Sequence, residues 1–170
     1  GVISSYFKQE HVITQHQVGS YNNFIDHVFP QMISQFFPMK INFSDKQISG
    51  VSIDIRNLKP SVPMCSENNG FEQLMTPLIA RKRNFTYSMS MNIDVHYKIL
   101  SVENGVNIVG KEQIIKDVLM CKIPILMGSK HCVSKINSLD ECKYDPGGYF
   151  IINGNEKVLI SQEKIAPNVI

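Results

Sequence analysis

Residues 85–99 read FTYSMSMNIDVHYKI and alternate between apolar and polar side chains from end to end. A period of two indicates a β-strand with one face on a core and the other towards solvent. The side chains predicted to share the core face are Phe85, Tyr87, Met89, Met91, Ile93, Val95, Tyr97 and Ile99. At about 3.3 Å per residue the strand is roughly 45–50 Å long, so we expect a bulge or a strong twist within it.

Shorter apolar runs on both sides of this stretch predict further strands. Residues 51–55 (VSIDI) show the same half-buried alternation. The runs 106–109 and 114–120 predict two separate strands. The run 123–127 is entered through Pro124, which favours a sheet edge or the start of a strand.

A long helix is predicted ahead of these strands. Apolar residues recur there at steps of three and four, which places them on one stripe of an amphipathic helix. The stripe comprises Tyr21, Phe24, Ile25, Val28, Phe29, Met32, Ile33, Phe36 and Phe37. Ser20 precedes the stripe and is a favourable helix cap. Pro30 cannot donate a backbone hydrogen bond to Asp26, so we expect a kink there.

Two local signals complete the fold class. Thr76 followed by Pro77 is typical of a helix start, and this short helix is expected to run towards Arg83. Asn153-Gly154 separates the apolar runs Gly148–Ile152 and Glu156–Ser161, which favours a hairpin. We therefore predict an α+β fold with a largely antiparallel sheet, a long amphipathic N-terminal helix and a terminal Asn-Gly hairpin.

The composition is that of one globular unit. The 170 residues are 43% hydrophobic and 19% charged, with a net charge of +2. So small a charge argues against an autonomous nucleic-acid-binding domain, although it leaves room for one basic face. No run approaches the roughly 18 apolar residues of a membrane span, so we expect no membrane partner. The first residue is Gly1 and not Met, so we expect an excised or processed segment.

No catalytic constellation is visible in the sequence. The phosphate-binding motifs G-x-x-x-x-G-K-[ST] and G-x-G-x-x-G are absent, and no carboxylate cluster suits magnesium. None of the four cysteines forms a C-x-x-C pair, although His131, Cys132 and Cys142 lie near one another in sequence. The absence of a tight knuckle favours reduced thiols over a zinc site. We therefore expect no catalytic residue, no metal and no cofactor in this segment.

Three motifs occur in order along the chain. Residues 80–88 read ARKRNFTYS, residues 123–132 read IPILMGSKHC, and residues 146–163 read PGGYFIINGNEKVLISQE. Together they resemble the N-terminal part of the second-largest, β-like subunit of multisubunit DNA-directed RNA polymerases of the eukaryotic and viral type. In that family the stretches read roughly ARLRNLTYS, LPIMLRSKxC and GGYFIINGSEKVLIAQE. The resemblance spans nearly the whole chain, and the third motif is the most specific.

The resemblance implies that residues 1–170 are the N-terminal part of the protrusion domain, ending near the start of the lobe. That domain is a non-catalytic wall of the cleft for DNA and the RNA–DNA hybrid, in a nucleotidyltransferase that synthesises RNA on a DNA template. The implied partners are the largest and the smaller polymerase subunits, the DNA template and the hybrid. Mg²⁺ is expected in the whole enzyme from the largest subunit. The implied location is intracellular, either the nucleus or a viral factory in the cytoplasm.

An alternative function remains open at this point. The same fold in a stand-alone nucleic-acid-binding or virion-associated module would carry similar motifs. The near-neutral charge favours the polymerase. Gly128 stands where the family often has arginine, and residues 164–168 (KIAPN) also depart from its usual sequence. These departures indicate a distant lineage, of which a large DNA virus is one example.

Two groups of side chains are candidates for function. Arg81 and Arg83 belong to the densest basic cluster, which either ties the short helix to the sheet or contacts a nucleic-acid backbone. We favour the structural role. The resemblance implies that Lys157, Gln162 and Lys164 approach the hybrid, where lysines would make sequence-independent phosphate contacts. For Lys157 the alternative is a salt bridge or a side chain that snorkels to solvent.

Overall fold

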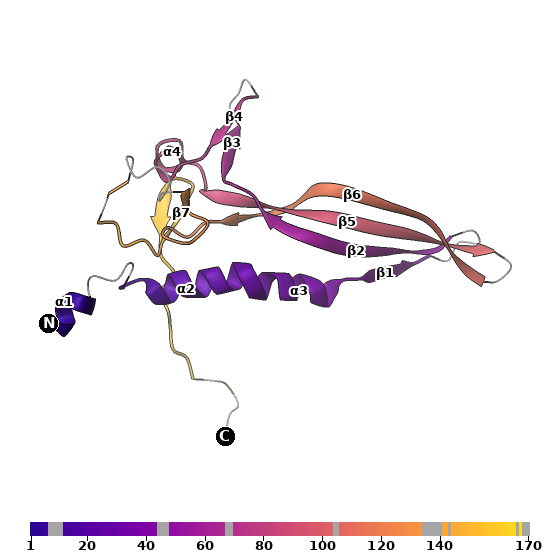
Figure 1. Ribbon diagram of the computed structural model, residues 1–170, viewed down its shortest axis with the longest axis horizontal. Helices are drawn as coiled ribbons and strands as arrows, with labels where there is room; N and C mark the ends of the chain where they lie inside the picture. Colours follow the sequence, from indigo (N-terminus) through magenta and orange to yellow (C-terminus); the bar gives the residue numbers. More distant parts are fainter. Residues whose placement is uncertain are drawn as a thin grey trace.

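A four-stranded antiparallel sheet forms the body of the protein. The computed structural model describes residues 1–6, 12–43, 48–66, 70–103, 106–133, 141–142, 144–165 and 167. The sheet order is β1-β2-β5-β6, and Figure 1 shows a row of helices lying alongside part of the sheet. The strands of this sheet are β1 (Met39–Asn42), β2 (Ile48–Pro60), β5 (Ser88–Glu103) and β6 (Val106–Pro124).

The alternating stretch forms the central strand β5. The strand begins at Ser88 and ends at Glu103, so it is shifted towards the C-terminus relative to the prediction. Met89, Met91 and Ile93 are buried, which confirms the predicted core face in the first part of the strand. Val95, Tyr97 and Ile99 are only half-buried, and Asp94 on the predicted solvent face is buried. The register with β6 shifts at three places, so the predicted irregularity is confirmed as well.

The runs 106–109 and 114–120 both form strand as predicted, but they belong to one strand, β6, of 19 residues and not to two. The polar residues between the two runs do not interrupt it, since a strand at the edge of a sheet can expose side chains there. Pro124 lies at the end of β6, which is an edge strand, so the predicted sheet edge is confirmed and the predicted strand start is not. Ile125 and Met127, which follow it, are buried.

The long helix is partly confirmed. Helical structure continues from α2 (Gln15–Asn23) through the π-helix η1 (Phe24–Val28) to α3 (Phe29–Phe36). The predicted start at Ser20 was wrong, because α2 begins at Gln15. The wider π-turn ends at Val28, two residues before Pro30, whose missing N–H leaves the regular helical ladder incomplete there.

The apolar stripe of this helical row is only partly buried. Ile25 and Ile33 are buried, whereas Val28, Met32 and Phe36 are exposed. The nine residues of α2 include no buried side chain. The amphipathic character therefore belongs to η1 and α3 and not to the whole row.

The core lies where the smaller elements meet the end of the sheet. α4 (Pro77–Lys82) is confirmed with its cap, since the Thr76 hydroxyl accepts a hydrogen bond from the backbone N–H of Ile79 at 3.3 Å. The other short elements are α1 (Val2–Tyr6), β3 (Met64–Ser66), β4 (Glu72–Leu74), β7 (Phe150–Ile152) and β8 (Asn155–Lys157). The core cluster consists of Ile25, Cys65, Met75, Ala80, Tyr87, Met89, Met91, Ile125, Met127, Cys132, Val133 and Ile151.

The pairing near the C-terminal end is shorter than predicted. β7 and β8 pair antiparallel with Ile152 opposite Asn155. Asn153 and Gly154, between them, have φ of +50° and +77°. Strand structure does not extend to Ser161, because residues 158–161 are extended but outside the ladder. Within the described part of the chain, no helix is long and apolar enough to cross a membrane.

Candidate functional site

The three motif segments meet at Tyr87, which belongs to the first motif. Its backbone N–H donates to the carbonyl of Ile151 in the third motif, and its carbonyl accepts from the N–H of Ile125 in the second, both at 2.9 Å. The second and third motifs are also joined directly, because the Met127 N–H donates to the Tyr149 carbonyl at 2.8 Å. Segments far apart in sequence therefore form one interlocked junction.

The side chain of Tyr87 extends this junction into the core. Its hydroxyl donates to Sγ of Cys132 at 3.7 Å and accepts from the backbone N–H of Val133 at 3.0 Å. Burial raises the pKa of Tyr87 above its ordinary value, so the phenol stays protonated and acts as a donor. Cys132 is a buried partner of this hydroxyl and also contacts Sδ of Met127 at 3.8 Å.

Arg81 holds α4 against the third motif. Its Nη1 donates to both carboxylate oxygens of Glu141 at 2.9 and 3.0 Å, and its Nε donates to Glu156 at 2.8 Å. Its Nη2 donates to the hydroxyl of Tyr149 at 2.8 Å, and the guanidinium also lies 5.9 Å from that ring's centre. Burial lowers the pKa of Arg81, but the hydrogen bonds and the charge of Glu141 outweigh it, and the net pKa is raised. This arrangement supports the structural role favoured for Arg81.

Arg83 and the following turn lie beside the same junction. The guanidinium of Arg83 stands 4.9 Å from the centre of the Phe85 ring, a cation–π distance. Gly154 packs on this turn, because its N–H donates to the Phe85 carbonyl at 3.0 Å. A Cβ at Gly154 would lie 2.6 Å from the side-chain oxygen of Asn84 and 2.9 Å from its Cα. Only glycine fits both this approach and a positive φ.

The structure separates the three residues predicted to contact nucleic acid. Lys157 is exposed at the end of β8, where it lines a groove beside α2. Gln162 and Lys164 are exposed in the extended segment that follows. Figure 1 shows this segment leading away from the sheet and past α2. Lys157 therefore belongs to the folded body, whereas Gln162 and Lys164 project from it.

One anchor of the extended segment was not visible in the sequence. Nε2 of Gln17, on α2, donates to the carbonyl of Leu159 at 3.0 Å. The groove beneath has a volume of about 850 Å³ and is walled on one side by residues 157–161. Tyr21 also lines the groove, and it is held in place because its hydroxyl donates to the Pro124 carbonyl at 2.7 Å and its ring meets Phe150 edge-on. No local motif marks Gln17, so only the fold could reveal this contact.

No metal site is formed by the residues that the structure describes. Among them, no three His, Cys, Asp or Glu side chains lie together as metal ligands would. Cys132 is buried in the core and Cys142 is exposed, so the two are placed very differently. Burial lowers the pKa of the neighbouring His131, which favours its neutral form. The expectation that the cysteines bind no zinc stays a prediction.

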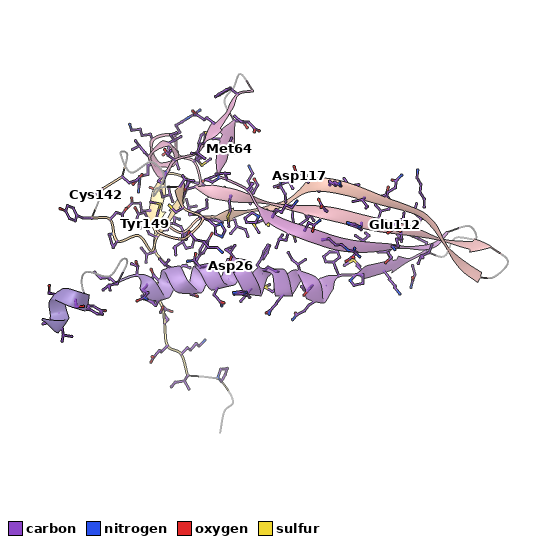
Figure 2. The ribbon with its side chains drawn as sticks, viewed as in Figure 1. Asp26, Met64, Glu112, Asp117, Cys142 and Tyr149 are labelled. Carbon is purple, nitrogen blue, oxygen red and sulfur yellow. The ribbon has the colours of Figure 1, made fainter. Side chains whose placement is uncertain are left out.

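The loop that departs from the family pattern contains a glycine with a positive φ. Gly128 has φ of +83°, a conformation that an arginine side chain rarely adopts. The next residues of the loop face α2 and η1: the Lys130 ammonium pairs with Asp26, and its N–H donates to Asn22 at 3.3 Å. The loop is therefore tied to the helical row without a side chain at position 128. Figure 2 shows Asp26 on the row and Tyr149 at the neighbouring junction.

Comparison with known proteins identifies the family. The sequence model of the family described as "RNA polymerase beta subunit" matches residues 12–170. The chain is 33% identical to DNA-directed RNA polymerase II subunit 2 of Arabidopsis thaliana, over 98% of the chain and 15% of the relative. It is 31% identical to subunit RPB2 of Schizosaccharomyces pombe, over 99% of the chain and 16% of that protein.

An archaeal relative shows the same similarity. The chain is 32% identical to subunit Rpo2N of Methanocaldococcus jannaschii, over 98% of the chain and 33% of that subunit. The chain thus spans about a sixth of the two eukaryotic relatives and a third of the archaeal one. The three motifs fall inside the matched residues, and their segments form the junction described above. This chain belongs to the RNA polymerase beta subunit family.

Proposed function

We propose that this chain is a non-catalytic wall of the nucleic-acid cleft in a DNA-directed RNA polymerase, and that residues 1–170 are the N-terminal part of its protrusion domain. The observation that carries the proposal is the match of nearly the whole chain to second subunits of such polymerases. RNA synthesis on a DNA template is then the activity of the assembly. Mg²⁺ would be supplied by the largest subunit and not by this segment.

The hydrogen bonds of the junction would make it a rigid support for the segment that follows β8. A backbone hydrogen bond from Tyr87 to Ile151, together with the hydrogen bonds from Arg81 to Tyr149 and Glu156, fixes the third motif on the core. The extended segment after β8 starts from this fixed base and is held again where Gln17 reaches Leu159. Lys164 follows the anchored Leu159 by five residues, so the anchor limits how far Lys164 can lie from the groove. This supports a contact of Lys164, together with Gln162, with the RNA–DNA hybrid.

The partners and the location follow from the same proposal. The largest subunit and the smaller subunits of the polymerase would surround this domain, and the DNA template and the hybrid would pass along it. The site of action would be the nucleus or a viral factory in the cytoplasm. A stand-alone nucleic-acid-binding module is the alternative, and its net charge of +2 would give it little affinity for DNA.

Replacing Lys164 with alanine tests the cleft-facing assignment. Lys164 is exposed, so folding should be unchanged, while the elongation complex is left with one fewer lysine–phosphate interaction. The slope of log K against log salt should fall in magnitude by about 0.9 for each such interaction removed. The variant should therefore weaken the complex most at low salt, and the difference should shrink as salt is raised. Dissociation of the assembled polymerase from an RNA–DNA scaffold over a range of KCl concentrations measures this.

Lys40→Ala is the matched control, because Lys40 is an exposed lysine on β1, remote in sequence from the third motif. It should leave both the lifetime and the salt slope unchanged. A Lys164→Ala polymerase with a normal lifetime at every salt concentration would refute the contact of this segment with the hybrid. It would leave the family membership and the junction unaffected.

A further inference from the structure

The helix α2 docks on the second and third motifs through polar side chains. None of its nine residues is buried, so apolar packing does not explain its position. Thr14, Gln17 and Tyr21 follow one another at steps of three and four, which places them on one face of the helix. Their side chains all donate to backbone carbonyls of the two motifs, namely those of Pro146, Leu159 and Pro124. This polar face is therefore the surface that holds α2 in place.

Thr14 and Gln17 lie directly on Gly148. The Thr14 hydroxyl donates to the Pro146 carbonyl at 2.7 Å, and it makes no capping hydrogen bond within its own helix. A Cβ at Gly148 would stand 2.6 Å from Cγ2 of Thr14 and 2.7 Å from Oε1 of Gln17. Gly148 is itself fixed, because its N–H donates to the Met127 carbonyl at 2.8 Å. The first turn of α2 is thus seated on a fixed part of the third motif.

The side-chain amide of Gln17 links two distant parts of the third motif. Its Oε1 lies over Gly148, near the start of the motif. Its Nε2 donates to the carbonyl of Leu159, near the end, at 3.0 Å. Gln17 is half-buried in this position. The backbone at Leu159 is therefore tied, through one side chain, to the part of the motif that is fixed on the core.

Packing contributes little to the position of the segment after β8. Val158, Leu159 and Ile160 are 59%, 70% and 82% exposed, and residues 158–165 belong to no strand. An extended chain advances by up to about 3.6 Å per residue, so Lys164 can lie at most about 18 Å from Leu159 but about 25 Å from Lys157. The bond from Gln17 thus shortens the free chain up to Lys164 from seven residues (158–164) to five (160–164).

We infer that Gln17 is a positioning residue of the polymerase: by holding Leu159, it directs Lys164, together with Gln162, to one place along the RNA–DNA hybrid. This inference rests on the proposed function and adds to it the residue that sets the contact. The effective concentration of a tethered group falls as the free chain lengthens, roughly as the −3/2 power of its length. Loss of the anchor should therefore dilute the Lys164 ammonium at its phosphate about two- to threefold.

Photocrosslinking from position 164 in the assembled polymerase measures this placement directly. A photoreactive benzophenone residue takes the place of Lys164, and the crosslinked nucleotides of the hybrid are mapped. With Gln17 present, the crosslinks should fall on one short run of nucleotides. Gln17→Met keeps much of the length of the side chain but removes the donor, so the yield at the main nucleotide should fall about two- to threefold. Gln15→Met is the matched control, because Gln15 is exposed on the same helix, and it should leave the pattern unchanged.

The lifetime of the elongation complex at low salt separates positioning from other effects of Gln17. Gln17→Met should shorten this lifetime by no more than the double variant Gln162→Ala/Lys164→Ala does. Added to that double variant, Gln17→Met should cause no further loss, because it acts through the same two residues. Hydrogen exchange in peptides covering residues 150–157 should stay unchanged in Gln17→Met, since Thr14 and Tyr21 still hold α2.

The outcomes distinguish this inference from the proposed function. Crosslinks in Gln17→Met that match those with Gln17 present would overturn the inference and leave the contact with the hybrid standing. An equal loss of lifetime with and without Gln162 and Lys164, or faster exchange of residues 150–157, would also overturn it, because Gln17 would then act by another route. If position 164 gave no crosslink to the hybrid even with Gln17 present, the proposed contact itself would be refuted, and the inference with it.

Discussion

Valine at position 154 should open the terminal pairing of β7 and β8 more than any other single substitution considered for this chain. Gly154 has φ of +77°, where a β-branched side chain is strained by about 1–3 kcal/mol. The new Cβ would also stand 2.6 Å from Oδ1 of Asn84 and 3.1 Å from the carbonyl oxygen of Arg81, so the turn after α4 must move. Such overpacking costs about 1–3 kcal/mol more. A total of about 3 kcal/mol or more corresponds to local exchange that is more than about 100-fold faster.

Hydrogen exchange measured by mass spectrometry on the assembled polymerase checks this result in peptides that cover residues 150–157. Gly70→Val is the matched control, because Gly70 has φ of +79° but a Cβ there would meet nothing within 4 Å. Gly70→Val should cause only the backbone strain of a positive φ, about 1–2 kcal/mol. Faster exchange should therefore be confined to peptides around residue 70. Equal acceleration in the two variants would show that the packing of Gly154 on Asn84 adds nothing.

Replacing Arg81 with methionine should have the second-largest effect. Methionine keeps much of the length of the side chain but leaves the carboxylate of Glu141 without its bidentate partner. Glu141 has only 12% of its side chain exposed, and Arg81 has 23%. Removal of one partner of a buried ion pair costs about 3–5 kcal/mol, and partial exposure reduces this to about 2–3 kcal/mol here. Exchange around residues 144–157 should therefore accelerate by about 30- to 150-fold.

Two variants show which contact of Arg81 matters. Glu156→Gln removes a partner that is 55% exposed, so it should cost less than about 1 kcal/mol. Arg81→Lys keeps the charge but cannot donate to Glu141, Glu156 and Tyr149 together, so its effect should lie between the other two. If Arg81→Met accelerated exchange no more than Glu156→Gln, the ion pair with Glu141 and the hydrogen bond to Tyr149 would be shown to add nothing to the stability of this junction.

The fold was predictable where one short segment carries its own signal. The strict alternation of residues 85–99 predicted β5, and Thr76-Pro77 predicted α4 with its cap, because both depend on neighbours in sequence. The start of α2 was missed because Gln15–Asn23 is mostly polar and buries no side chain. The single long strand β6 was missed because an edge strand tolerates polar interruptions that would end a buried one.

The candidate site was predictable only as a set of residue types. Arg81 stood out as part of a basic cluster, but its main partner Glu141 lies 60 positions away, in no motif with it. Gln17 and Leu159 are 142 positions apart, so nothing local could connect them. The predicted strand from Glu156 to Ser161 was too long for a related reason. Its last residues are apolar and read as a strand, whereas the fold places them across α2, outside the ladder.

The central claim is that this chain is part of a polymerase, and affinity purification tests it most directly. An affinity tag joined to the endogenous polypeptide, followed by purification from native extract at physiological salt, would recover whatever the chain is assembled with. We predict recovery as part of a polypeptide much longer than 170 residues, in near-equal amounts with a largest polymerase subunit. Recovery only as a short polypeptide, without any largest subunit, would contradict the account.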